Sequence, residues 1–154
     1  MKPGRLRRLT EGEARLAREM FGGGLEPGRV RVLAMPGLRR AFVPGGRLVV
    51  WPAATARVDF AAAEVPVEVQ AVFVHEMTHV WQSQNGVNLL MAKLRAGDRA
   101  CAYDYDLTDG CAFTARNIEQ QAMLVQHAFL AARGVPTPYP PALYAAALAD
   151  RARG

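Results

Sequence analysis

The sequence predicts an α+β fold in which several helices dominate a small β-sheet. Two long helical patterns, over about residues 66–85 and 114–133, and two short strand-like runs between residues 29 and 52 support this prediction. Hydrophobic residues make up 51% of the 154 residues, which is enough to bury one core. We therefore expect a single domain spanning residues 1–154.

The chain begins with a basic segment that is followed by a capped helix. Residues 1–9 include one lysine and several arginines, and we expect them to form a flexible basic N-terminus. Thr10 and Glu13 have the spacing of a capping box, in which each side chain accepts a hydrogen bond from the other residue's backbone amide. The helix is expected to run to Phe21, because three consecutive glycines follow it.

Two strands and then a series of helices are expected after this helix. Residues 29–35 begin by alternating basic and apolar side chains, and residues 48–51 form an apolar run closed by a proline. Turn signals at 36–37 and 44–46 flank these segments. The helices are expected over residues 66–85, 89–95, 114–133 and 141–153, with a loop over 101–113. The helix over 66–85 is apolar nearly all round, which is typical of a buried helix.

Composition and charge argue against several classes of partner. The net charge of +5 does not indicate nucleic-acid binding, because no basic stripe carries interleaved aromatic side chains. No run reaches the roughly 18 apolar residues of a membrane span, and no apolar stretch of signal-peptide length follows the N-terminus. We therefore expect no nucleic-acid partner, no membrane partner and a cytoplasmic protein by default, with signal-independent export left open. Cys101 and Cys111 are expected to be free thiols, with a disulfide after export or a metal-ligand role as alternatives.

The chemistry-bearing motif is HEMTH, which places His75, Glu76 and His79 inside the buried helix. Residues i and i+4 share one face of a helix, so both rings can direct a nitrogen at one Zn²⁺ at roughly 2.0–2.1 Å. Glu76 then stands beside the open coordination position, where it can act as general base toward a metal-activated water. Two of the chain's three histidines fall in this motif, and burying them with a carboxylate is costly without a partner. The motif therefore predicts a zinc site.

A third ligand is needed, and an acidic side chain outside the motif is expected to supply it. The candidates are Asp98, Asp104, Asp106, Asp109, Glu119 and Asp150. Glu119 is preferred because it lies in a helical pattern that is otherwise apolar on its inner face. Ala115 and Ala122 flank it there and are small enough to allow close helix packing.

Other polar residues near these segments have expected supporting roles. Tyr103 and Tyr105 could donate a hydrogen bond to an oxyanion, and Tyr105 is taken as the candidate catalytic aid. Gln82 lies about one turn from His79 and could bond to it behind the metal. The third histidine, His127, lies about 12 Å along the helix from Glu119, so it is expected to be structural or exposed.

The segments HEMTHVWQ and NIEQQA together resemble a family of small bacterial HExxH domains that are often labelled Vgr-related and linked to phage-tail-like and type VI secretion systems. More broadly, residues 46–127 resemble a minimal gluzincin. The resemblance implies a zincin-like fold in which a small sheet packs on the HExxH helix, GRLVVWP is the edge strand and a second helix carries a ligand. It implies His75, His79 and Glu119 as metal ligands and Glu76 as the catalytic carboxylate.

The resulting hypothesis is a zinc metallopeptidase that hydrolyses bonds in a peptide or protein substrate, with a secretion-system component as a further partner. One alternative is a non-catalytic, zinc-stabilised interaction module of a secretion apparatus. Another is a helical domain in which HExxH has no function. Glu76 favours the enzyme, because a structural zinc site usually fills its fourth position with Cys or His.

Overall fold

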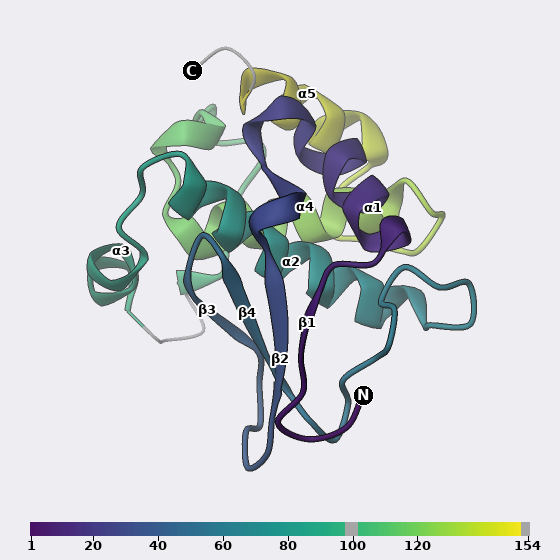
Figure 1. Cartoon of the computed structure of the whole chain (residues 1–154). Coiled ribbons are helices and arrows are strands. Elements are labelled where there is room, and N and C mark those ends of the chain that lie inside the picture. The colour runs from purple at the N-terminus through teal and green to yellow at the C-terminus, as the bar shows by residue number, and fades with distance from the viewer. Residues whose placement is uncertain (98–101, 152–154) are drawn as a thin grey trace.

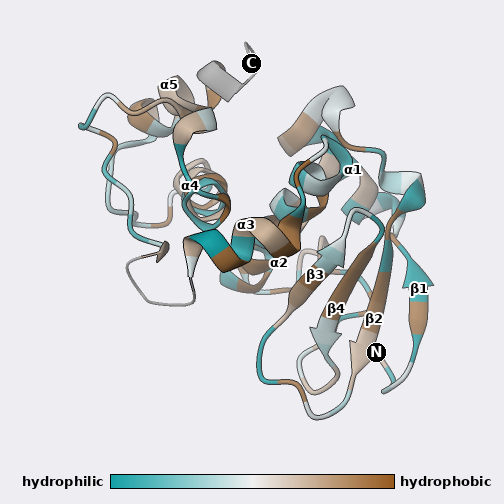
Figure 2. Cartoon of the chain, turned by 90° about the vertical axis from the view of Figure 1, so that its left-hand side faces the viewer, coloured by the Kyte–Doolittle hydropathy of each residue, from teal (hydrophilic) through white to brown (hydrophobic). Residues whose placement is uncertain are grey.

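The computed structural model describes residues 1–97 and 102–151 and confirms the helix-dominant α+β class (Figure 1). The helices are α1 Glu11–Phe21, α2 Val67–Gln84, α3 Leu89–Ala96, α4 Ile118–Ala131 and α5 Pro141–Arg151. The strands are β1 Leu6–Arg8, β2 Arg31–Met35, β3 Phe42–Gly45 and β4 Leu48–Pro52. Helices α2, α3 and α4 lie to one side of the sheet, with α5 beyond α4 (Figure 2). No helix in this described part of the chain is long and apolar enough to cross a membrane.

The four strands form one mixed sheet in the order β1-β2-β4-β3. β1 is antiparallel to β2, β2 is parallel to β4, and β3 is antiparallel to β4. The expectation that GRLVVWP forms an edge strand is wrong: β4 lies inside the sheet, and the Gly46-Arg47 turn joins it to β3 at the edge. Pro44 is compatible with β3 because this strand is at the edge, where a missing amide hydrogen costs no ladder bond.

The N-terminal segment is not the flexible tail that its basic composition predicts. Leu6–Arg8 pair with β2, and Arg7 donates two hydrogen bonds of 2.6 Å to the carboxylate of Glu13. Glu13 is fully buried and also accepts hydrogen bonds from the backbone amides of Thr10 and Phe60. A paired cation stabilises a buried carboxylate, and the ion pair between Arg7 and Glu13, six residues further on, fixes the segment beside α1 while its backbone pairs with β2. The predicted capping box between Thr10 and Glu13 is confirmed.

An aromatic cluster fixes α2 against the sheet. Trp51 of β4 packs against Phe60 with ring centroids 4.3 Å apart, and Phe60 stacks on Phe73 of α2 at 4.8 Å. Phe60 and Phe73 are fully buried, as are most positions of the helix from Phe73 to Val80. The prediction of a buried helix here is confirmed. Because the helix is held on the sheet by this cluster, the HExxH segment has a fixed position.

Helix α4 begins four residues later than the periodicity predicts, at Ile118. Asn117 is its N-cap: the side-chain oxygen accepts hydrogen bonds from the amides of Glu119 and Gln120, and the Gln120 side chain accepts one from the Asn117 amide. Ala115 therefore precedes the helix, whereas Ala122 is fully buried on it. The cap places Glu119 in the first turn of α4.

Candidate metal centre

The structure brings His75, His79 and Glu119 together between α2 and α4, which pack side by side (Figure 1). The Nε2 atoms of His75 and His79 lie 3.4 Å and 3.2 Å from the same atom, Oε2 of Glu119. One ligand atom from each of the three residues lies within 4.8 Å of the others, and all three residues are buried. This is a group that could hold a metal ion.

A chain of amide side chains orients His79. Nε2 of Gln82 donates to the backbone oxygen of Ile118 at 3.0 Å and to Oε1 of Gln121 at 2.9 Å. Gln121 in turn donates to the backbone oxygens of Phe113 and Arg116. The amide nitrogen of Gln82 is thereby fixed by a backbone carbonyl, so its oxygen faces Nδ1 of His79 at 2.9 Å. The predicted contact between Gln82 and His79 is confirmed.

This orientation determines which His79 nitrogen is free to bind. Nδ1 must donate its hydrogen to Gln82, so in the neutral ring Nε2 carries a lone pair directed toward Glu119. Two acceptors at 3.2 Å repel each other unless a positive charge lies between them. Protonation of both histidines would place two charged rings in a buried site, which is costly. One divalent cation would satisfy all three residues, so the donor set fits a metal.

Replacing Gln82 with Leu is expected to weaken zinc binding by about tenfold, because the ring of His79 loses the partner that fixes its tautomer. The measurement is a zinc titration in competition with a chromophoric chelator. Ser83→Ala, on the next residue of α2, is the matched control and should bind zinc as the wild type does. Equal affinities for Gln82→Leu and wild type would show that the amide chain does not support the ligand.

The protonation of the cluster follows from burial and from mutual contact. Burial raises the pKa of Glu76 above its ordinary value, although His79, His75 and Lys93 oppose this shift. Burial also tends to raise the pKa of Glu119, but in the metal-free site hydrogen bonds from the protonated rings of His75 and His79 outweigh it and hold that pKa far below its usual range. For His79, burial lowers the pKa while contact with Glu119 raises it, and the net direction is upward. Glu119 is thus a carboxylate suited to ligation, and Glu76 a carboxyl group with increased basicity.

Lys93 of α3 contacts the carboxylate of Glu119 at the oxygen that does not face the histidines. The sequence does not reveal this contact. Its Nζ atom lies 3.6 Å from Oε1 of Glu119, whereas Oε2 of the same carboxylate faces both histidines. One oxygen of Glu119 therefore contacts the ammonium group of Lys93, and the other is directed at the place between the histidines where a metal would bind.

A pocket of about 420 Å³ opens onto the cluster. Its walls include Trp51 and Pro52 of β4, Val72 of α2 and Tyr103, and Glu76 lines it beside the two histidines. The lining residues are Arg39, Arg40, Ala41, Trp51, Pro52, Thr55, Val72, His75, Glu76, His79, Lys93, Tyr103, Glu119 and Gln126. The buried ligand group therefore has an open side that a substrate can reach.

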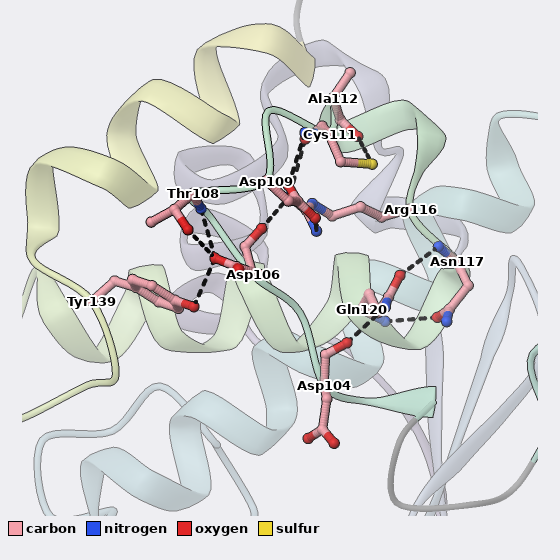
Figure 3. A network of polar contacts seen from close by, with 10 residues as sticks. All are labelled: Asp104, Asp106, Thr108, Asp109, Cys111, Ala112, Arg116, Asn117, Gln120 and Tyr139. Atoms are coloured by element: carbon pink, nitrogen blue, oxygen red, sulfur yellow. Dashed lines mark hydrogen bonds and ion pairs between the residues drawn. The ribbon is translucent and has the colours of Figure 1, made fainter.

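The loop before α4 carries Tyr103 to this pocket and is tied down by polar contacts (Figure 3). The buried guanidinium of Arg116 pairs with Asp109 and donates to the backbone oxygen of Asp106 at 2.7 Å. Nε2 of Gln120 donates to the backbone oxygen of Asp104 at 2.6 Å, directly after Tyr103. The same side chain that caps α4 thus also fixes the loop that supplies the pocket wall.

Tyr105, the sequence-based candidate for a catalytic aid, is not brought to the cluster. Its hydroxyl bonds with Nδ1 of His127 and the hydroxyl of Tyr144, away from the residues that line the pocket. Burial raises the pKa of Tyr105 and lowers that of His127, so both side chains are neutral, and Tyr105 joins the loop before α4 to His127 of α4 and Tyr144 of α5. This contact agrees with the prediction of a structural role for His127. Tyr103, two residues earlier, is the tyrosine that lines the pocket.

The remaining sequence candidates lie elsewhere. The carboxylates of Asp106 and Asp109 accept hydrogen bonds from their own loop, and Asp104 is exposed beside them. Cys111 is exposed and free. The candidates Asp98 and Cys101, and the side chain of Asp150, fall outside the described part of the structure.

Comparison with known proteins relates this chain to the effector domain of a secretion spike protein. No family model matches the sequence. The chain is 32% identical over 136 residues to the type VI secretion system spike protein VgrG2b of Pseudomonas aeruginosa, a match that covers 80% of this chain but only 13% of the spike protein. The solved effector domain of the same VgrG2b superposes with a TM-score of 0.72 at 30% identity, covering 94% of this chain and 82% of that domain. The resemblance to Vgr-related proteins is thereby confirmed, and the chain belongs to the family of the VgrG2b effector domain.

Proposed function

We propose that this chain is a zinc-dependent peptidase with His75, His79 and Glu119 as metal ligands and Glu76 as general base. The supporting observation is the convergence of Nε2 of both histidines on one oxygen of Glu119, with the tautomer of His79 fixed by Gln82. A divalent cation would balance this buried group, and His₂Glu with an open side is one of the ligand sets of catalytic zinc sites.

The residues around the open side would divide the work of hydrolysis. A bound zinc ion would supply Lewis acidity, which lowers the pKa of water toward about 7 and polarises a carbonyl oxygen. Glu76 takes one proton from the water as the water oxygen forms a bond to the carbonyl carbon. It then delivers this proton to the leaving nitrogen as the C–N bond breaks, which yields a carboxylic acid and an amine, and the remaining proton of the acid passes to the amine. One oxygen of Glu76 is buried without a hydrogen-bond partner among the described residues, as expected of a group that bonds a substrate or water.

Tyr103 is the residue we propose for holding the carbonyl oxygen, in place of Tyr105. It lines the pocket together with Glu76 and both histidines, and its loop is fixed by Gln120 and Arg116. A phenolic hydroxyl aimed at a developing oxyanion stabilises the transition state more than the substrate.

We further propose that the chain acts as an effector of a type VI secretion system. Its relation to a domain described as an effector, within a protein described as a secretion spike, supports this role. A peptide or protein in the recipient compartment would then be the substrate.

The alternative of a non-catalytic zinc module is less consistent with the site. A structural zinc site needs a fourth protein ligand, and within the described residues the metal-binding group contains three. The pocket opens at this position, and Glu76 lines it. These features favour catalysis.

The test is cleavage of a randomised peptide library by the purified, zinc-loaded chain, with new amino termini identified by mass spectrometry. We expect cleavage that a chelator abolishes and added zinc restores. If the zinc-loaded chain produces no new termini in the library or in denatured protein mixtures, the peptidase proposal fails.

A further inference from the structure

The rim of the pocket is basic although the cluster within it is acidic. Arg39 and Arg40 line the pocket from the segment between β2 and β3, and Lys93 lines it from α3. Its two acidic side chains, Glu76 and Glu119, are both buried and belong to the proposed machinery. A divalent ion in the site would add two further positive charges, so a substrate would meet a clearly positive pocket.

The basic side chains differ in whether a carboxylate of the protein already pairs with them. Lys93 contacts Glu119 at 3.6 Å, and other arginines of the fold have carboxylate partners, as Arg7 does with Glu13. Arg39 is exposed, and within residues 1–97 and 102–151 it makes no hydrogen bond or ion pair. Its guanidinium is therefore available to a ligand without a competing carboxylate in the protein.

We propose that the pocket selects peptides that carry an aspartate or glutamate side chain close to the cleaved bond, with Arg39 as the residue that pairs with it. This inference rests on the proposed peptidase function. A guanidinium offers paired donors that match the two oxygens of a carboxylate. A positively lined cleft also concentrates anionic ligands, and its field is stronger beside low-dielectric walls such as Trp51 and Pro52.

The experiment compares peptide pools that differ only in Glu or Gln at each of the four positions around the cleaved bond. We expect wild type to cleave the Glu pool about fivefold more efficiently in kcat/KM at one of these positions, since a partly exposed ion pair contributes modestly. Arg39→Gln should abolish this preference, and Arg39→Glu should reverse it. Arg15→Gln removes an exposed arginine of α1 outside the pocket and should leave the preference unchanged. Raising the salt concentration should reduce the preference in wild type.

Binding is measured separately, by fluorescence anisotropy of labelled Glu and Gln peptides on the zinc-loaded Glu76→Gln variant, with and without Arg39→Gln. Arg39-dependent preference for the Glu peptide, without cleavage by the wild type, would support the selectivity and overturn only the peptidase proposal. Cleavage by the wild type with equal rates for Glu and Gln at all four positions would overturn the selectivity and leave the peptidase proposal intact.

Discussion

Glu76→Gln is expected to lower kcat for peptide cleavage by about 1,000-fold while the chain keeps its zinc. The amide has nearly the same shape as the carboxylate, so the pocket and the ligands stay in place. It cannot accept the proton of the attacking water, however, because its nitrogen is a donor and its oxygen is a weak base. The measurement is kcat on the best library peptide together with zinc content per chain.

The matched control for this variant is Glu68→Gln, an exposed carboxylate in the first turn of the same helix. Its rate should stay within about twofold of wild type, since surface substitutions of this kind have small effects. A rate for Glu76→Gln within about tenfold of wild type, with zinc still bound, would show that another group serves as the base.

The wild-type pH profile should also report this residue. Glu76 is active as a carboxylate, so kcat/KM should fall as the pH drops through its pKa, which burial raises and a bound cation would lower. We expect an acid limb in the profile of the wild type measured at saturating zinc. A profile without an acid limb, or the same limb in the residual activity of Glu76→Gln, would contradict the assignment of Glu76 as the base.

Removal of the metal is expected to lower the melting temperature by about 10 °C. His75 and His79 come from α2 and Glu119 comes from α4, so a bound ion ties together the two helices of the core. At a free zinc concentration about 1,000 times the dissociation constant, binding contributes about 4 kcal/mol to folding stability. Without the ion, only protonation of the histidines balances the carboxylate of Glu119, and this places a charged ring in a buried site.

Thermal unfolding followed by circular dichroism, with and without a strong chelator, measures this effect. His79→Ala is the control: having lost a ligand, it should melt at the same temperature in both conditions. An equal chelator effect in His79→Ala, or none in the wild type, would show that these three residues do not form the stabilising metal site.

The predictable part of the fold rests on local patterns. Helix α2 is apolar nearly all round and is followed by Asn85-Gly86, so its extent is readable from the chain alone. β1 is not predictable in this way, because a basic terminal segment is usually solvated. Only the burial of Glu13 shows why Arg7 and its neighbours are held in the fold. β3 is not predicted either, because Pro44 and Gly45 are turn signals in a sequence, although both are compatible with an edge strand.

The site residues on helices were predictable from the sequence, whereas those on the loop were not. Helical spacing predicts that His75 and His79 share a face, and the apolar residues around Glu119 in the sequence distinguish it from the other acidic candidates. The contact between Gln82 and His79 follows from the same helical spacing. Tyr103 and Tyr105 are two residues apart in an irregular loop, where no periodicity tells which side chain enters the pocket.

Local sequence patterns do not predict which basic residues lie at the rim of the pocket. Arg39 precedes β3 and Lys93 belongs to α3, and these segments are brought to one pocket only by the tertiary fold. Their place at the rim therefore has no sequence signal.

The most direct test of the account is metal content by elemental mass spectrometry on wild type and three variants, His79→Ala, Glu119→Ala and Glu76→Gln. We predict about one zinc per chain in wild type and in Glu76→Gln, and loss of zinc in the two ligand variants. Wild-type protein that holds no metal and takes up none from added zinc would contradict it, as would unchanged zinc content after the loss of Glu119.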